Sequence, residues 1–178
     1  MFRIHQETPQ DAQEVEYLYD LCFAPGRSAL SSYRLREGVE PVAELCLNAR
    51  DDYDTLAAAI RYWPVQIGQA ASPALLLGPV AVHPTRQGEG LGALLITSSL
   101  ERAAESGWHR VILVGDEPYY RRFGFSRALA KDLQFPPPTN TERLLAHALQ
   151  DAAFDNVSGM VQKWGHRADD STQGKNSS

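Results

Sequence analysis

The chain has 178 residues, of which 43% are hydrophobic and 22% are charged, and its formal net charge is −5. This composition is typical of a soluble globular domain, and the acidic balance excludes a general electrostatic affinity for nucleic acid or anionic membranes. The two cysteines, Cys22 and Cys46, form no CxxC pair and have no histidine cluster nearby, so we expect neither a disulfide framework nor a metal site.

The sequence also gives expectations about location. The first residues contain no basic segment followed by an apolar one, so we expect no signal peptide and a cytoplasmic protein. The longest apolar runs, 74–77 and 111–114, are too short to cross a bilayer, so we expect no membrane partner. No basic stripe surrounds the tryptophans, which again favours no nucleic-acid partner.

A short strand and a helix are predicted at the start of the chain. Phe2–His5 alternates in polarity, as a strand does. Thr8 is then a suitable N-cap residue, Pro9 suits the first helical position, and Asp11 lies three residues after the cap, as in a capping box. Apolar residues at helical spacing continue this helix, which we expect to end at Pro25-Gly26.

The next segments predict a short helix and three strands. The helix is expected over Ser28–Glu37. Pro41–Asn48 predicts a strand on which Glu44 faces away from the neighbouring leucines. Ala58–Ile67 predicts a second strand, although its alanines also favour helix. Ala74–Val82 is apolar almost throughout, which is typical of a buried central strand.

A βαβ unit is predicted next. The loop 86–92 leads into an apolar helix over 91–106, and the apolar strand 111–114 follows. A right-handed crossover would make this strand a parallel neighbour of Ala74–Val82. Pro118 and Gly124 bracket a short helix, and 136–138 predicts an extended proline linker. Late strands are expected at Arg143–Leu149 and Gly159–Lys163.

The loop Arg86-Gln87-Gly88-Glu89-Gly90-Leu91-Gly92 indicates an anion site. The first amides of a helix have no intrahelical acceptor, and glycines let a phosphate approach the backbone closely. Glu89 carries a like charge, so we expect its side chain to point to solvent. A tight turn that only packs the helix on the sheet is the alternative. Gly88-x-Gly90-x-x-Ala93 also fits the dinucleotide fingerprint, but few βαβ repeats can follow it.

Two motifs, Gln87-x-x-Gly90-x-Gly92 and the residues from Tyr120 to Phe125, lie on either side of the predicted helix 91–106 and strand 111–114. They resemble the Q/R-x-x-G-x-G/A signature and the Y-x-x-x-G-F motif of the GNAT acyltransferases. The resemblance implies an α/β fold with a central, mostly antiparallel sheet, one parallel βαβ unit, splayed central strands and helices on both faces. We expect one such domain over 1–164. Residues 165–178 are almost wholly polar and predict a disordered tail.

The resemblance also implies the site. The amides of Gln87, Gly88, Glu89, Gly90, Leu91 and Gly92 would hold the pyrophosphate of coenzyme A, and the backbone of Val80, Ala81 and Val82 would pair with its pantetheine arm. Tyr120 would protonate or hydrogen-bond the leaving thiolate. A packing role is the alternative for Tyr120, although the adjacent Tyr119 can supply the structural tyrosine. Glu44 is the candidate base, and an outward surface residue is an equal alternative. His83 and Asp116 are weaker candidates for proton transfer.

The implied function is acetyl transfer from acetyl-CoA to a primary amine, on a small molecule or a protein, by direct attack in a ternary complex without a metal. The enzyme would be a monomer or a homodimer. Two alternatives remain: a non-catalytic acyl-CoA-binding regulatory domain, and a protein that binds a nicotinamide dinucleotide.

Overall fold

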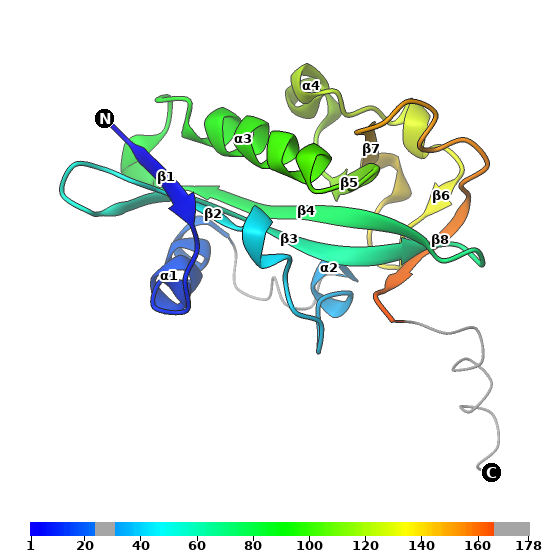
Figure 1. Ribbon diagram of the computed structural model, residues 1–178, viewed down its shortest axis with the longest axis horizontal. Coiled ribbons are helices and arrows are strands. Elements are labelled where there is room, and N and C mark those ends of the chain that lie inside the picture. The colour runs from blue at the N-terminus through cyan, green and yellow to red at the C-terminus, as the bar shows by residue number, and fades with distance from the viewer. Residues whose placement is uncertain (24–30, 166–178) are drawn as a thin grey trace, which may run out of the picture.

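The computed structural model describes residues 1–23 and 31–165, which build an eight-stranded sheet flanked by helices (Figure 1). The strands are β1 (Arg3–Gln6), β2 (Leu47–Arg50), β3 (Leu56–Ile67), β4 (Ser72–Val82), β5 (Arg110–Val114), β6 (Leu133–Gln134), β7 (Leu144–Ala148) and β8 (Gly159–Lys163). The helices are α1 (Ala12–Cys22), α2 (Ser31–Arg34), α3 (Leu91–Glu105) and α4 (Glu117–Tyr120). The sheet order is β1-β2-β3-β4-β5-β7, and β8 pairs with both β3 and β6.

The helices cover both faces of the sheet, which leaves its central strands buried. Helix α3 lies on one face, and α1 and α2 lie on the other (Figure 1). Leu91, Leu95 and Ile96 of α3 belong to the main hydrophobic core, while Val15 and Leu18 of α1 belong to a separate cluster with β3 and β4. Burial on two faces explains why β4 is apolar almost throughout and why Arg61 and Gln66 are the polar exceptions in β3.

Strands β4 and β5 are parallel neighbours that separate before β4 ends. They are paired only at Leu75 with Val111 and at Leu76 with Ile112. Beyond that point β4 stays paired with β3 as far as Val82, while β5 stays paired with β7 as far as Val114. The register between β3 and β4 shifts next to Gly78, where β4 carries one extra residue, so β4 is bulged where it leaves β5. The predicted splayed mixed sheet and its βαβ unit are confirmed.

Two predictions for the N-terminal third of the chain were wrong in detail. The first helix begins at Ala12 and not at Pro9, because the Asp11 carboxylate accepts hydrogen bonds from the Thr8 amide (2.8 Å) and hydroxyl (2.9 Å) and closes a turn ahead of the helix. The segment 41–48 is no single strand. It contains the 3₁₀ turn η2 (Ala43–Leu45), and β2 starts only at Leu47.

Other predictions differ less from the structure, or concern residues outside the described ranges. The prolines 136–138 include a turn and do not run extended, and the short strand β6 just before them was not predicted. Strand β3 starts two residues earlier than expected, at Leu56. The helix end at Pro25-Gly26, the first residues of Ser28–Glu37 and the tail from 166 to 178 lie outside the described residues. None of the helices in the described ranges has the length and apolar character needed to cross a membrane.

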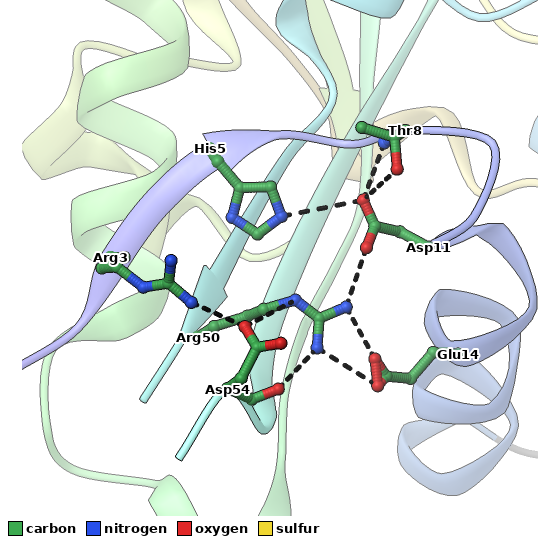
Figure 2. A pocket seen from close by; sticks show the side chains of 7 residues that line it. All are labelled: Arg3, His5, Thr8, Asp11, Glu14, Arg50 and Asp54. Carbon is green, nitrogen blue, oxygen red and sulfur yellow. Dashed lines mark hydrogen bonds and ion pairs between the residues drawn. The ribbon is translucent and has the colours of Figure 1, made fainter. Parts of the chain in front are cut away.

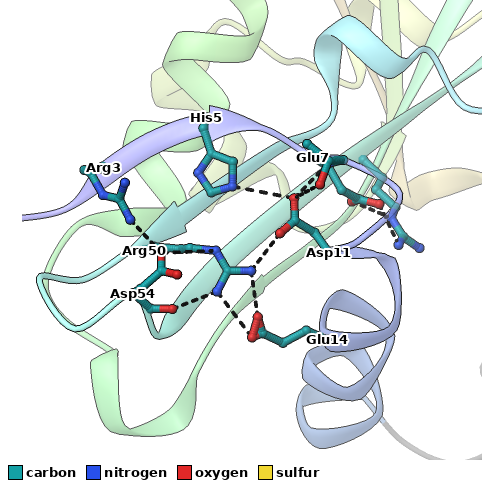
Figure 3. Close-up of polar contacts among 9 residues, drawn as sticks. Arg3, His5, Glu7, Asp11, Glu14, Arg50 and Asp54 are labelled. Atoms are coloured by element: carbon teal, nitrogen blue, oxygen red, sulfur yellow. Dashed lines mark hydrogen bonds and ion pairs between the residues drawn. The ribbon is translucent and has the colours of Figure 1, made fainter.

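Charged side chains join α1 to the sheet, as Figures 2 and 3 show. Arg50 is 8% exposed, and its guanidinium lies 2.8 Å from Asp11 and 2.6 Å from Glu14. Arg61 of β3 pairs with Glu16 of α1 and, at 3.0 Å, with Glu7 in the segment between β1 and α1. The hollow drawn in Figure 2 has a volume of about 460 Å³, but its arginines are already paired with carboxylates. We therefore assign this region to holding α1 on the sheet.

Candidate functional site

A pocket of about 340 Å³ lies where β4 ends and α3 begins. Six residues predicted to bind coenzyme line it, namely Val82, Gln87, Gly88, Gly90, Leu91 and Gly92. Val80, Ala81 and Glu89 are not among its lining residues. Tyr119 and Arg122, which follow β5 in the chain, also line it, so the pocket joins two segments about 30 residues apart.

The loop keeps its shape through two glycines and one glutamine. Gly88 and Gly90 have φ angles of +84° and +77°, a region that side chains other than glycine rarely adopt. The Gln87 side-chain amide donates a 3.0 Å hydrogen bond to the Val82 carbonyl and so ties the loop to the end of β4. Gly90 is the N-cap of α3 and accepts from the Leu94 amide. The amides ahead of Leu94, at the start of α3, have no intrahelical acceptor and are available to a ligand in the pocket.

The charges of the loop are partly compensated within the protein. The Arg86 guanidinium lies 2.6 Å from the Asp51 carboxylate and 3.7 Å from that of Glu89. Hydrogen bonds from the Thr55 and Tyr53 amides, together with Arg86, hold the pKa of Asp51 below its usual value. The Glu89 side chain thus lies beside Arg86 and outside the pocket lining, in agreement with its expected orientation.

The two adjacent tyrosines occupy different places. Tyr119 lines the loop pocket, and its hydroxyl lies 3.3 Å from the point where a Cβ on Gly92 would be. Tyr119, which we expected to supply the structural tyrosine of the pair, packs on Phe123 and also faces the loop pocket. The sequence held no signal for this difference, because both residues lie on one short helical turn.

Tyr120, the last residue of α4, is half-buried against Gly115, which directly follows β5. Its ring packs on Gly115 and lies edge-on to Phe125, with the ring centroids 6.1 Å apart. Burial, with smaller contributions from Tyr119 and Asp116, raises the pKa of Tyr120 to about 12. The phenol is therefore protonated at neutral pH and can act as a hydrogen-bond donor.

The other proton-transfer candidates lie outside the loop pocket. Glu44 is exposed on η2 and is not a residue of a strand, so its predicted setting was wrong. His83 Nδ1 accepts hydrogen bonds from the Thr85 amide (3.2 Å) and pairs with its hydroxyl (2.8 Å), which caps the turn after β4. Asp116 pairs with Arg143 at 3.1 Å, and its side chain caps no helix.

The backbone of β4 presents hydrogen-bonding groups on the side that β5 has left. The His83 amide donates to Ala57, so alternation along the antiparallel pair directs the Ala81 groups toward β3 and those of Val80 and Val82 away from it. The Val82 carbonyl also accepts from the Cys22 thiol at 3.3 Å. The backbone groups of Val80 and the amide of Val82 thus face the gap.

No group of three or more histidine, cysteine or acidic side chains that could hold a metal ion occurs in residues 1–23 and 31–165. One parallel βαβ unit within an otherwise mostly antiparallel sheet also differs from the doubly wound sheet that the dinucleotide alternative requires.

Comparison with known proteins agrees with this geometry. Residues 12–125 match the acetyltransferase (GNAT) family. The uncharacterized N-acetyltransferase YhbS of Escherichia coli K12 is 29% identical over 163 residues, which cover 92% of this chain and 96% of that protein.

Two solved structures are also similar. E. coli YhbS in complex with CoA has a TM-score of 0.79 at 29% identity, over 91% of this chain and 89% of that one. A GNAT family acetyltransferase from Brucella melitensis in complex with acetyl-CoA has a TM-score of 0.65 at 30% identity, over 87% of this chain and 99% of that one. The family match spans both predicted motifs and most of the sheet, and the chain therefore belongs to the acetyltransferase (GNAT) family.

Proposed function

We propose that this protein transfers an acetyl group from acetyl-CoA to a primary amine. The observation that carries the proposal is the glycine-loop pocket, in which unpaired amides at the start of α3 lie beside the end of β4. The related structures from E. coli and B. melitensis, which contain CoA and acetyl-CoA, support the choice of coenzyme. We propose one catalytic domain over 1–164, acting in the cytoplasm as a monomer or homodimer.

The residues present suit a diphosphate and an extended amide-containing arm. Gly88 and Gly90 have nothing within 4 Å of an added Cβ, so the pocket is open in front of them, and the amides from Gln87 to Gly92 can converge on a phosphate. The free backbone groups of Val80 and Val82 can pair with the amides of a pantetheine arm, as an added strand would. Ala81 would then contribute through contact with the arm and not through its hydrogen bonds.

Acetyl-CoA supplies an acetyl group activated as a thioester. The protein must first favour the neutral amine, which for an amine of pKa about 10.4 is roughly one molecule in a thousand at pH 7. Glu44 is the proposed base, and its exposed position on η2 suits transfer of the proton through water. The Val82 amide is the proposed donor to the oxygen that becomes negative during attack.

Tyr120 is proposed to donate a hydrogen bond to the departing thiolate. Its raised pKa keeps the proton on the phenol across the working pH range, and its place on Gly115 directs it to the end of β5. The acceptor is a small-molecule or protein amine. A metal ion has no role in this scheme, and we expect activity to survive a chelator.

The test is release of free CoA from acetyl-CoA across a panel of small amines and lysine peptides. Wild type should be active with at least one acceptor, and Tyr120→Phe should lower turnover about tenfold or more while coenzyme affinity stays the same. Tyr53→Phe is the matched control, because Tyr53 is 89% exposed. Coenzyme binding with no turnover on any amine, and no effect of Tyr120→Phe, would instead favour a non-catalytic acyl-CoA-binding domain.

A further inference from the structure

The loop pocket is lined by two arginines whose surroundings differ. Arg86 comes from the loop side and lies between the carboxylates of Asp51 and Glu89. Arg122 comes from the segment after α4 and is exposed. Within the described part of the chain, Arg122 has no carboxylate partner and makes no hydrogen bond. Arg122 is therefore the cation of this pocket whose charge remains available to a ligand.

Aromatic rings fix where this charge lies. The Arg122 guanidinium stands over the Tyr119 ring, 4.4 Å from its centroid, and 4.9 Å from the centroid of Phe123. Tyr119 in turn reaches the start of α3, since its hydroxyl would nearly touch a side chain at Gly92. Stacking on an aromatic face holds a guanidinium in one plane without using its N–H groups. Those donors stay free, and they belong to the same pocket as the first residues of α3.

The neighbouring arginine, Arg121, does not share the aromatic stacking and the pocket position of Arg122. Arg121 is 70% exposed, pairs with Glu117 at 3.5 Å, and does not line the pocket. The loop itself offers little net positive charge, because Glu89 lies within it and Asp51 is bound to Arg86. A pyrophosphate at the helix amides carries two negative charges and would gain from a further cation in the pocket, and Arg122 is a lining residue that can supply it.

We propose that Arg122, stacked on Tyr119, binds a phosphate of the coenzyme and supplies the positive charge that the glycine loop lacks. The inference rests on the proposed coenzyme. The phosphate is either part of the pyrophosphate or the 3′-phosphate of the adenosine moiety, and both offer anionic oxygens that a guanidinium can bind. In either case Arg122 is a binding residue and takes no part in proton transfer.

The experiment is calorimetric titration of wild type, Arg122→Gln, Arg122→Lys and Arg121→Gln with CoA and with 3′-dephospho-CoA. Arg122→Gln should weaken CoA binding about tenfold, the loss expected for an exposed charge-assisted hydrogen bond. Arg122→Lys should lose less, and Arg121→Gln should stay within about twofold of wild type. The deficit of Arg122→Gln should shrink in about 1 M salt, where charges are screened.

The two ligands distinguish the two phosphates. An effect of Arg122→Gln on CoA that disappears with dephospho-CoA assigns Arg122 to the 3′-phosphate, and an equal effect on both assigns it to the pyrophosphate. If wild type binds CoA and Arg122→Gln changes the dissociation constant by less than twofold, the role of Arg122 is overturned and the proposed function still stands. A wild type that binds neither ligand would overturn the proposed function together with this inference. Thermal melts of the variants in the absence of ligand check that each one is folded.

Discussion

Gly115 and the ring of Tyr120 leave no room for a methyl group between them. A Cβ built on Gly115 would lie 2.6 Å from Tyr120 Cε2 and 3.0 Å from Leu113 Cδ1. Because non-bonded carbon atoms approach to about 3.5–4.0 Å, Gly115→Ala requires the ring to retreat by roughly 1 Å. We expect this overpacking to lower the free energy of unfolding by about 1–3 kcal/mol. Leu113 can adjust more easily, since the contact involves the end of its side chain.

A double-mutant cycle isolates the contact between these two residues. Urea unfolding is measured for wild type, Gly115→Ala, Tyr120→Ala and the double variant. Gly115→Ala should cost about 1–3 kcal/mol in the presence of Tyr120 and close to nothing in its absence, since no ring then opposes the methyl group. In an amine acetylation assay, Gly115→Ala should also lower turnover, by up to about a hundredfold for a 1 Å displacement of the phenol. Additive effects within about 0.5 kcal/mol would refute the packing of Tyr120 on Gly115.

Two further predictions concern charge and pH. Arg50→Met should lower the free energy of unfolding in urea by about 3 kcal/mol, because it leaves the 13%-exposed Asp11 carboxylate without its main cation. Arg3→Gln, at an ion pair whose side chains are about two thirds exposed, should lower it by under about 1 kcal/mol. Equal losses in the two variants would contradict the difference in burial. The pKa of Tyr120 is raised to about 12 from about 10 in the unfolded chain, so its contribution to stability is complete below pH 10 and is lost as the pH rises toward 12. Wild type should therefore lose about 2–3 kcal/mol more than Tyr120→Phe between pH 10 and 12, and parallel stability curves would contradict the burial of this phenol.

The central βαβ unit could be predicted because its sequence signals agree with one another. Ala74–Val82 and Val111–Val114 are apolar almost throughout, the helix between them is apolar in its first half, and the loop contains closely spaced glycines. Burial imposes the apolar runs, and the positive φ angles of Gly88 and Gly90 require the glycines, so local sequence and tertiary context give the same answer. The family motifs lie in the same region, and six of the residues predicted to bind coenzyme line the loop pocket.

The errors lie where tertiary contacts override local pattern. Leu45, Cys46 and Leu47 are all buried, so no alternation identifies a strand there, and η2 occupies the place instead. At the first helix, Asp11 bonds back to Thr8 and delays the start of the helix. The roles of Tyr119 and Arg122 depend on how α4 packs against the start of α3, and that contact leaves no local signal in the sequence.

The central claim is that the glycine loop binds acetyl-CoA, and a thermal-shift titration tests it most directly. Acetyl-CoA at a hundredfold its dissociation constant should stabilise the protein by about 2.7 kcal/mol, which for a domain of this size raises the melting temperature by roughly 5–10 °C. NADH at the same concentration should leave the melting temperature unchanged. A rise with NADH and none with acetyl-CoA, or no rise with either ligand, would contradict the account.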